Sequence, residues 1–551
     1  MSEMRANSRR RQRQSGVAMI LLTLMLMSVL LPMVALAIDV TMLYVVKAKL
    51  QGAVDGAVLA AGRSITGAVT LAAQTPRLQN IAQQFLKANL PQGYWGATAP
   101  VIEGSDCTTG AGCVNVFQNL DTKKIFVTVT ASVQVPLLFA RTIWNKETSS
   151  FNTTSTVRVT GQALRRWVRL VLVLDRSSSM AGAPLTALKD AVTNSDPQKG
   201  FVTNFSEDRD QMGLVVFGGS AIVAYPPRDP TIADGGGNGP DQLFKSHSPN
   251  IVTLVNQLAS GSNTGTTEGL ILAYRELQKS PQPLYLNAIV LFTDGMPNGI
   301  TAVYNGTTSP SVPSVIKTPG CTNYRPTDPP IEGWMAQWGG YADANGNGVG
   351  IYSMMQNTRK HTGTTNDQDV QDWMAFSGTE AQLTATQNAG GCHFLSGTNP
   401  EHRIGEDLVS FPIQDVYGNA TNTADYRNAK IYHNINKALD MTAVTNAYQI
   451  GLISWNATFN AAKTIRSDTS LKPVIFCIGY NGGDEIDRSL MKRIANTNQD
   501  FQTWAQDSRG QYLFSDYDPT STTGRYYEAA TPGAIAAAFQ QVQSEVLRLS
   551  M

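Results

Sequence analysis

The sequence predicts an α/β protein whose main domain is a doubly wound, mostly parallel sheet with a large insertion. One N-terminal transmembrane helix and a small α+β segment precede this domain. Three observations predict this fold. Residues 16–38 are an uncharged apolar run, and apolar and polar residues alternate in segments between 66 and 165. After residue 166, apolar runs typical of buried strands end at an acidic residue. We therefore divide the chain into residues 1–65, 66–165 and 166–551, with an insertion at about 300–442.

Residues 16–38 predict a membrane-spanning helix. As a helix they would extend about 34 Å, which exceeds a hydrocarbon core of about 30 Å. Five arginines precede the run and keep that end in the cytoplasm: Arg5, Arg9, Arg10, Arg11 and Arg13. Pro32 is tolerated in such a helix. We expect a single-pass protein of the bacterial inner membrane, with its C-terminal bulk in the periplasm or outside the cell.

A cleavable secretory signal is the alternative, because Ala35-Leu36-Ala37 is an acceptable cleavage site. The apolar core of a signal is usually about 7 to 15 residues, so the longer run favours a retained anchor. Apolar residues continue at helical spacing from Leu43 to Ala61, which predicts that the helix extends beyond the membrane.

The middle region predicts half-buried strands, since apolar and polar residues alternate at 125–135 and 155–160. Cys107 and Cys113 lie in a Gly/Thr loop of this region and are expected to pair outside the cytoplasm. Cys321 and Cys392, both in the insertion, are a second candidate pair. Cys477 lies in a predicted core strand and is expected to be buried and unpaired.

Apolar runs beyond residue 166 predict the strands of the main sheet. The runs are 170–174, 211–217, a short edge strand at 222–225, then 288–292, 473–478 and a last strand at 511–514. Helices are expected at 270–277, 443–465, 485–495 and 531–547.

Oxygen-bearing side chains follow two of these strands. Asp175, Ser177 and Ser179 come after the first strand, and Asp294 follows the strand at 288–292. Thr264 lies in a hydroxyl-rich loop between them. Ligands of open α/β sheets collect beyond the carboxyl ends of strands, and hydroxyl and carboxylate oxygens suit Mg²⁺. The alternative interpretation is that Asp175 and the serines only cap the following helix.

The pattern Asp-x-Ser-x-Ser, a distant Thr and Thr-Asp-Gly resembles the metal-ion-dependent adhesion site of von Willebrand factor A domains. This resemblance implies that Ser177, Ser179 and Thr264 ligate Mg²⁺ directly or through water, while Asp175 and Asp294 hold waters. An open position would take a carboxylate from a protein partner; Ca²⁺ or Mn²⁺ could replace Mg²⁺. The family's loop reads Gly-Gly-Thr where this chain has Ser262-Asn263-Thr264, so Thr266 or Thr267 could serve in another register.

A second resemblance covers residues 14–65. Gly16-Val-Ala-Met, Ile38-Asp39, Leu43-Tyr44, Leu50-Gln51 and Asp55-Gly-Ala-Val-Leu-Ala are similar to the anchor of TadE/TadG-like proteins of tight-adherence (Flp) pilus systems. Large members of that group carry a von Willebrand A domain behind the anchor. The resemblance implies pilus components as partners. Leu21 stands where prepilin-peptidase substrates have Glu, so we expect no pilin-type processing.

The charge, the histidine spacing and the segment 343–348 argue against nucleic-acid binding, a zinc site and an EF-hand. A net charge of +1 with 15% charged residues does not indicate a nucleic-acid partner. The five histidines show no zinc spacing. The segment 343–348 begins like a calcium loop but has Met354 where an EF-hand needs Glu, which favours a turn.

We expect a binding protein and not an enzyme. A serine hydrolase using Ser177 or Ser179 would need a nearby histidine and the Gly-x-Ser-x-Gly signature, which those serines lack. A structural periplasmic scaffold, in which the metal only stabilises the sheet, remains the alternative.

Overall fold

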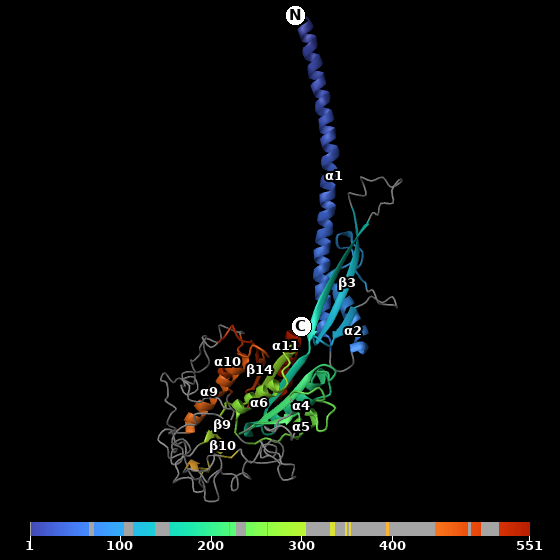
Figure 1. Cartoon of the computed structure of the whole chain (residues 1–551). Helices are drawn as coiled ribbons and strands as arrows, with labels where there is room; N and C mark the ends of the chain where they lie inside the picture. The colour runs from blue at the N-terminus through green and yellow to red at the C-terminus, as the bar shows by residue number, and fades with distance from the viewer. Residues whose placement is uncertain are drawn as a thin grey trace. The chain divides into compact units, whose positions relative to one another are not determined.

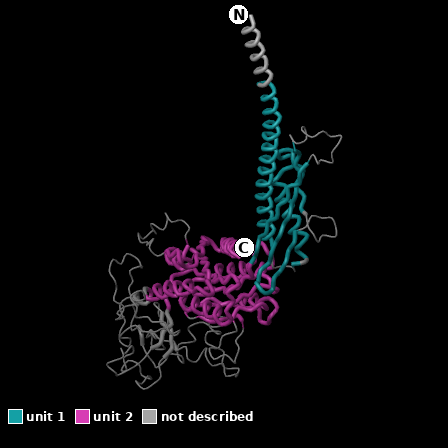
Figure 2. The backbone as a smooth tube through the Cα atoms, turned by 45° about the horizontal axis from the view of Figure 1, so that its top comes forward, with its two compact units in different colours: residues 1–65, 69–165, 551 teal, residues 66–68, 166–550 magenta. Residues whose placement is uncertain are grey.

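The computed structural model describes residues 2–65, 71–103, 114–137, 154–219, 221–226, 239–261, 263–304, 331–336, 348–349, 352–353, 393–395, 447–482, 486–497 and 517–550. The chain forms two compact units, shown in teal and magenta in Figure 2. Unit 1 comprises residues 1–65, 69–165 and 551, and unit 2 comprises 66–68 and 166–550. The N-terminal helix and the small α+β segment thus pack as one unit.

A single helix, α1 (Ser2–Arg63), forms the N-terminal part of unit 1 and continues through Pro32 (Figure 1). Its segment Met19–Arg63 is long and apolar enough to cross a membrane, judged by length and composition. Large apolar side chains between Met19 and Val34 are about half or more exposed, whereas Met42, Val46 and Leu50 are buried. The first part of this continuous helix is therefore apolar and exposed, and its second part is buried in the core of unit 1.

The rest of unit 1 covers the second half of α1. Its elements are α2 (Leu71–Asn89), η1 (Tyr94–Gly96), β1 (Val101–Glu103), β2 (Val114–Asn119), β3 (Lys124–Pro136) and β4 (Thr154–Arg166). β3 pairs antiparallel with β1 and β2, and it also pairs with β4. Alternate residues of β3, such as Val127 and Val129, are buried in one cluster with apolar residues of both helices.

Six strands form the main sheet of unit 2, in the order β15-β14-β8-β5-β6-β7. They are β5 (Val168–Asp175), β6 (Gln211–Phe217), β7 (Ala221–Tyr225), β8 (Leu286–Thr293), β14 (Val474–Tyr480) and β15 (Tyr526–Ala529). All neighbours are parallel except β7, which runs antiparallel to β6. Every residue of β5, β8 and β14 is buried, as expected for parallel strands covered on both faces.

Helices cover both faces of this sheet. One apolar cluster joins it to α4 (Ala183–Thr193), α5 (Ile251–Gln257) and α11 (Pro532–Leu549), and the other joins it to α6 (Thr266–Lys279), α9 (Ala447–Arg466) and α10 (Arg488–Ala495). Leu172 of β5 belongs to the first cluster and Val173 to the second. The sheet is therefore doubly wound, as the sequence predicts.

Strand order reverses between β5 and β8. From β5 the chain adds β6 and β7 on one side, and it then returns through α6 to add β8, β14 and β15 on the other side. This reversal creates a topological switch point at the carboxyl ends of β5 and β8, where ligands of such sheets bind.

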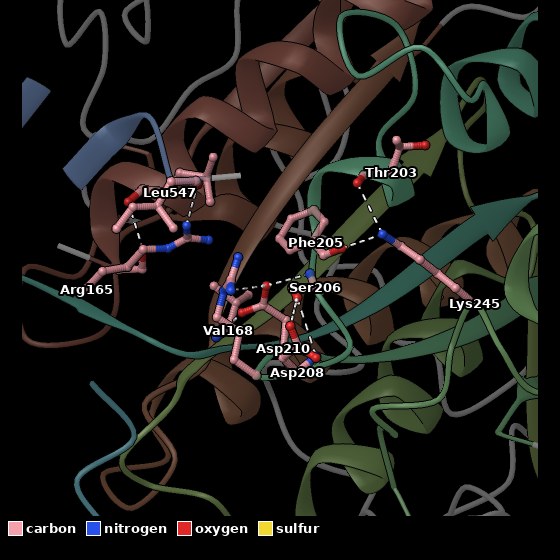
Figure 3. Close-up of polar contacts among 12 residues, drawn as sticks. Arg165, Val168, Thr203, Phe205, Ser206, Asp208, Asp210, Lys245 and Leu547 are labelled. Carbon is pink, nitrogen blue, oxygen red and sulfur yellow. Dashed lines mark hydrogen bonds and ion pairs between the residues drawn. The ribbon is translucent and has the colours of Figure 1, made fainter. Parts of the chain in front are cut away.

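Polar contacts at the opposite end of β5 hold its first residue (Figure 3). The Asp210 carboxylate accepts hydrogen bonds from the Val168 amide at 3.1 Å and from the Ser206 amide at 3.0 Å. Lys245 Nζ donates to the carbonyls of Thr203 and Phe205. The Asp210 carboxylate thus holds the first residue of β5, and Lys245 holds the loop that carries Ser206.

The insertion contains short strands in its described parts. β9 (Gly299–Tyr304), β10 (Ile331–Ala336) and β12 (Tyr352–Ser353) form one antiparallel sheet, while β11 (Gly348–Val349) pairs with β13 (His393–Leu395). Both suspected cysteine pairs and most of the turn at 343–348 lie outside the described residues. The strand expected at 511–514 also lies outside the described residues, and among the described strands β15 is at this edge of the sheet.

Candidate metal site

Asp175 connects the carboxyl ends of the two central strands. It is the last residue of β5 and is fully buried. Its Oδ1 accepts a hydrogen bond from the Ser177 amide at 2.7 Å, and its Oδ2 accepts one from Thr293 Oγ1 at 2.5 Å. Because Thr293 ends β8, the carboxylate joins the neighbouring strands at the switch point.

Burial raises the pKa of Asp175 to about 6, although hydrogen bonds from Thr293 and Ser177 act in the opposite direction. Desolvation penalises the charged carboxylate more than these hydrogen bonds favour it. A cation near this position would favour the charged form.

The hydroxyls of Ser177 and Ser179 converge on Asp294. Ser179 Oγ donates to Asp294 Oδ1 at 2.8 Å, Ser177 Oγ donates to the same oxygen at 3.3 Å, and the two hydroxyls are 3.0 Å apart. Ser177 and Asp294 are buried and Ser179 is half-buried. The structure thus brings four of the five proposed residues, Asp175, Ser177, Ser179 and Asp294, into one hydrogen-bonded group.

Thr264 lies beside the turn that follows Asp294. A Cβ placed on Gly295 would be 3.6 Å from Thr264 Oγ1. The Thr264 amide donates to Asn298 Oδ1 at 2.7 Å, and its carbonyl accepts from the Asn298 amide at 3.0 Å. This reciprocal pair holds the Thr264 loop against the segment after β8.

The neighbouring threonines are placed differently. Thr267 Oγ1 lies 2.7 Å from Thr458 Oγ1 and donates to the Ser454 carbonyl at 3.3 Å, so it faces α9. Thr266 is buried in the first turn of α6. The structure thus places Thr264 next to the Asp294 turn and directs Thr267 toward α9.

Sequence reasoning missed residues that hold these loops. Asn298 holds Thr264, and no local pattern marks it. Arg176 donates from its amide to the Phe217 carbonyl at 2.9 Å and from Nη1 to the Ala259 carbonyl at 2.9 Å. A Cβ on Gly265 would lie 2.6 Å from the Gly219 carbonyl oxygen, so only glycine allows the close approach of these two loops.

The donor set fits a hard cation. Within the described part of the chain, no group of three or more His, Cys, Asp or Glu side chains could hold a metal. The group at the switch point instead combines two carboxylates with hydroxyls, and oxygen-only ligands suit Mg²⁺, Mn²⁺ or Ca²⁺ rather than zinc.

Two family models match the chain. Residues 16–64 match the Flp pilus-assembly TadE/G-like family, and residues 170–296 match the von Willebrand factor type A domain. The second match includes all five residues proposed for the site. No curated protein matches the chain.

Several solved structures are weakly similar. A variant of the minor pilin PilB from Streptococcus sanguinis is 10% identical, over 82% of this chain and 80% of that chain, with a TM-score of 0.31. The pilus adhesin SpaC from Lactobacillus rhamnosus GG is 12% identical, over 81% and 37%, with a TM-score of 0.30. A von Willebrand factor type A protein from Catenulispora acidiphila is 9% identical, over 77% and 46%, with a TM-score of 0.29. This chain spans less than half the length of the last two proteins. The similarity to the TadE/G-like family and to the von Willebrand factor type A domain therefore rests on the two family models.

Proposed function

Because the chain carries a TadE/G-like segment followed by a von Willebrand factor A domain, we propose that it is a membrane-anchored, extracytoplasmic binding protein. Its metal site engages an acidic side chain of a protein partner during Flp pilus assembly or surface adhesion. The convergence of the Ser177 and Ser179 hydroxyls on Asp294, at the switch point of the sheet, carries this proposal.

Ser177, Ser179 and Thr264 would supply neutral hydroxyl ligands to one Mg²⁺, and Asp175 and Asp294 would hold its waters. When bound, the ion supplies an electrophilic position for an incoming carboxylate. Since the hydroxyls add no negative charge, they leave that position attractive to an acid. Thr293 and Asn298 keep the ligand loops in place through the hydrogen bonds described above.

The elements that flank the insertion contact the Thr264 loop on one side and the first turn of α6 on the other. β9 begins at Gly299, directly after Asn298, and α9 contacts Thr267 through Ser454 and Thr458. We therefore propose that residues between β9 and α9 shape what reaches the metal, as binding loops on rigid scaffolds do.

The anchor sets the compartment. The arginines before residue 16 keep the N-terminus in the cytoplasm, so both units would lie in the periplasm or outside the cell. The near-neutral charge suits a protein partner, such as a pilus component, better than nucleic acid.

A serine hydrolase is less well supported. The hydroxyls of Ser177 and Ser179 are hydrogen-bonded to each other and to Asp294. The imidazole of His247 is hydrogen-bonded to the Pro249 carbonyl. A base for Ser177 or Ser179 is therefore not evident in the described residues.

Substitution of the serines tests the metal site. Ser177→Ala and Ser179→Ala each remove a proposed ligand, so Mg²⁺ affinity of the full-length protein, measured by calorimetry, should fall at least about tenfold. Ser178→Ala is the matched control, because Ser178 lies between them on the same loop and is exposed. Equal affinity in all three variants would contradict the proposed ligands.

Partner binding separates adhesion from a stabilising role. Pili sheared from the cells should be retained by the immobilised protein in Mg²⁺, and released by EDTA. If Mg²⁺ binds and stabilises the fold while retention is unaffected by EDTA or by Ser179→Ala, the structural scaffold is the better description.

A further inference from the structure

Two contacts fix the register between β4 and α1 in unit 1. A Cβ on Gly161 would lie 2.8 Å from Val54 Cγ1 and 2.9 Å from Val58 Cγ2, so Gly161 is level with about residue 56. Four residues later, Arg165 Nη1 donates to the Ile65 carbonyl at 2.6 Å. Because α1 ends at Arg63, the helical part of this distance is the seven residues from Gly56 to Arg63, about 11 Å, and Ile65 lies just beyond it. Four strand residues span about 13 Å, so strand and helix run in the same direction side by side.

This register locates the first end of β4 along the helix. Thr154 lies seven residues before Gly161, about 23 Å, which equals about 15 helical residues and reaches the level of Thr41. The side chains of Thr130 and Thr160 and those of Gln134 and Thr156 are in contact, so Pro136 of β3 lies opposite Thr154. The uncharged run ends at Ile38. This end of the small sheet therefore lies about one helical turn beyond the apolar segment.

The burial of α1 residues also indicates that unit 1 packs against the helix close to the end of the apolar segment. Asp39 directly follows the uncharged run and is only 2% exposed, so the packing of unit 1 on α1 extends up to the apolar segment. Tyr44, on the same stretch of helix, is 74% exposed.

The turn η1 occupies this end of the sheet. A Cβ on Gly96 would lie 3.1 Å from Pro136 Cγ, and the Thr98 amide donates to the Gln134 carbonyl at 2.9 Å. Trp95 is 58% exposed although it is the largest side chain type. Its φ of 50° is left-handed, and it lies between Gly93 and Gly96, which also have positive φ. The turn thus holds an exposed indole in a backbone conformation that non-glycine residues rarely adopt.

We propose that the turn bearing Trp95 inserts into the headgroup region of the bilayer that α1 spans. The indole, apolar with one N–H donor, is the side chain that prefers this interface. Tyr44 on α1 adds a second amphipathic ring near the same depth. Unit 1 then contacts the membrane surface at two points, the helix and the turn. This inference rests on the proposed anchor, since without a spanning helix the depth of Trp95 has no reference.

Quenching by brominated lipids tests the contact. The full-length protein is reconstituted in phospholipid vesicles whose acyl chains carry bromine close to the headgroup, and its tryptophan emission is compared with that of Trp95→Phe. The chain has 8 tryptophans, so the difference between the two proteins isolates Trp95. We expect that this difference is large in unbrominated vesicles and mostly lost in brominated ones.

A matched control moves the tryptophan away from the membrane. Phe117 is 55% exposed and pairs with Phe126. The contacts of Thr130 with Thr160 and of Thr128 with Gln162 imply that Phe126 lies opposite Leu164, next to Arg165. Phe117 is therefore about 40 Å along α1 from Ile38. In Trp95→Phe combined with Phe117→Trp, the new emission should be equally strong in both kinds of vesicle.

The outcomes are distinct. Trp95 emission that is unchanged by brominated lipid, in protein that floats with the vesicles, overturns the inference and leaves the anchor intact. Protein that does not float with the vesicles contradicts the anchor, and with it the inference.

Discussion

At the scale of single residues, the buried carboxylate of Asp175 should make the stability of the protein depend on pH. Its folded pKa of about 6 lies above the ordinary value of 3.8, because desolvation disfavours the charged form. Between these values the folded state binds more protons than the unfolded state. Without metal, the free energy of unfolding should therefore fall as pH rises from about 4 to about 6, by about 3 kcal/mol in total.

Chemical unfolding between pH 4 and pH 8 measures this dependence. At the proposed site Mg²⁺ would require the charged carboxylate, so it should stabilise the protein more at pH 7 than at pH 5. Asp175→Asn removes the titrating group and should flatten the metal-free profile in this range. An unchanged slope in Asp175→Asn would assign the dependence to other groups.

The sequence predicted most of the residues that meet at the switch point. Asp175, Ser177 and Ser179 are close along the chain, and Asp294 ends a recognisable buried strand, so local pattern was sufficient. Thr264 was harder to place, because three threonines occur within four residues and each fits a loop before a helix. Only tertiary contacts distinguish them, with Thr267 facing α9 and Thr264 facing Gly295.

At the scale of elements, Asn298 joins the Thr264 loop to the segment after β8. Asn298→Ala removes the acceptor for the Thr264 amide, so Thr264 should lose its position and Mg²⁺ affinity should fall about tenfold. The free energy of unfolding should also fall by about 1 kcal/mol. Calorimetry and chemical unfolding measure the two effects.

Asn298→Asp is the control, because it keeps an oxygen acceptor for the same amide. It should bind Mg²⁺ at least as tightly as the unchanged protein. If Asn298→Ala also binds normally, Asn298 does not position Thr264.

Strands that are buried on both faces were the most predictable elements. β5, β6, β8 and β14 read as continuous apolar runs, so their positions agree with the prediction within a few residues. β15 was missed because it has only four residues, of which Ala529 alone is buried. Its pairing with β14 depends on tertiary contacts that short-range pattern does not encode.

At the scale of the whole molecule, α1 combines the proposed membrane span with the core of unit 1. Cleavage after Ala37 would leave the buried residues from Met42 onward in place, so the fold alone does not require retention of the anchor. We nevertheless expect retention, since the apolar run is longer than that of a signal.

Intact mass of the protein purified from membranes tests this expectation. It should include residues 1–37, and alkaline carbonate should not extract the chain. A mass that lacks those residues would establish a cleaved signal. Leu26→Arg, near the middle of the run, should reduce membrane integration, because a central arginine costs about 2.5 to 3.5 kcal/mol.

The order of the parts along the chain was predictable because each has its own composition: an uncharged run, alternating segments, then buried strands. The packing inside unit 1 could not be predicted in this way, because the position of β4 along α1 depends on tertiary contacts such as that of Gly161 with Val54.

The short connection between β4 and β5 affects how the chain would carry mechanical load. β4 ends at Arg166 and β5 begins at Val168, so Trp167 is the only residue between them. β4 in turn packs along the helix that would enter the bilayer. If unit 2 binds a pilus as proposed, tension on it would pass along the chain into a paired strand and a helix. Its resistance would then depend on the shearing of packed side chains and not on the stretching of a slack tether.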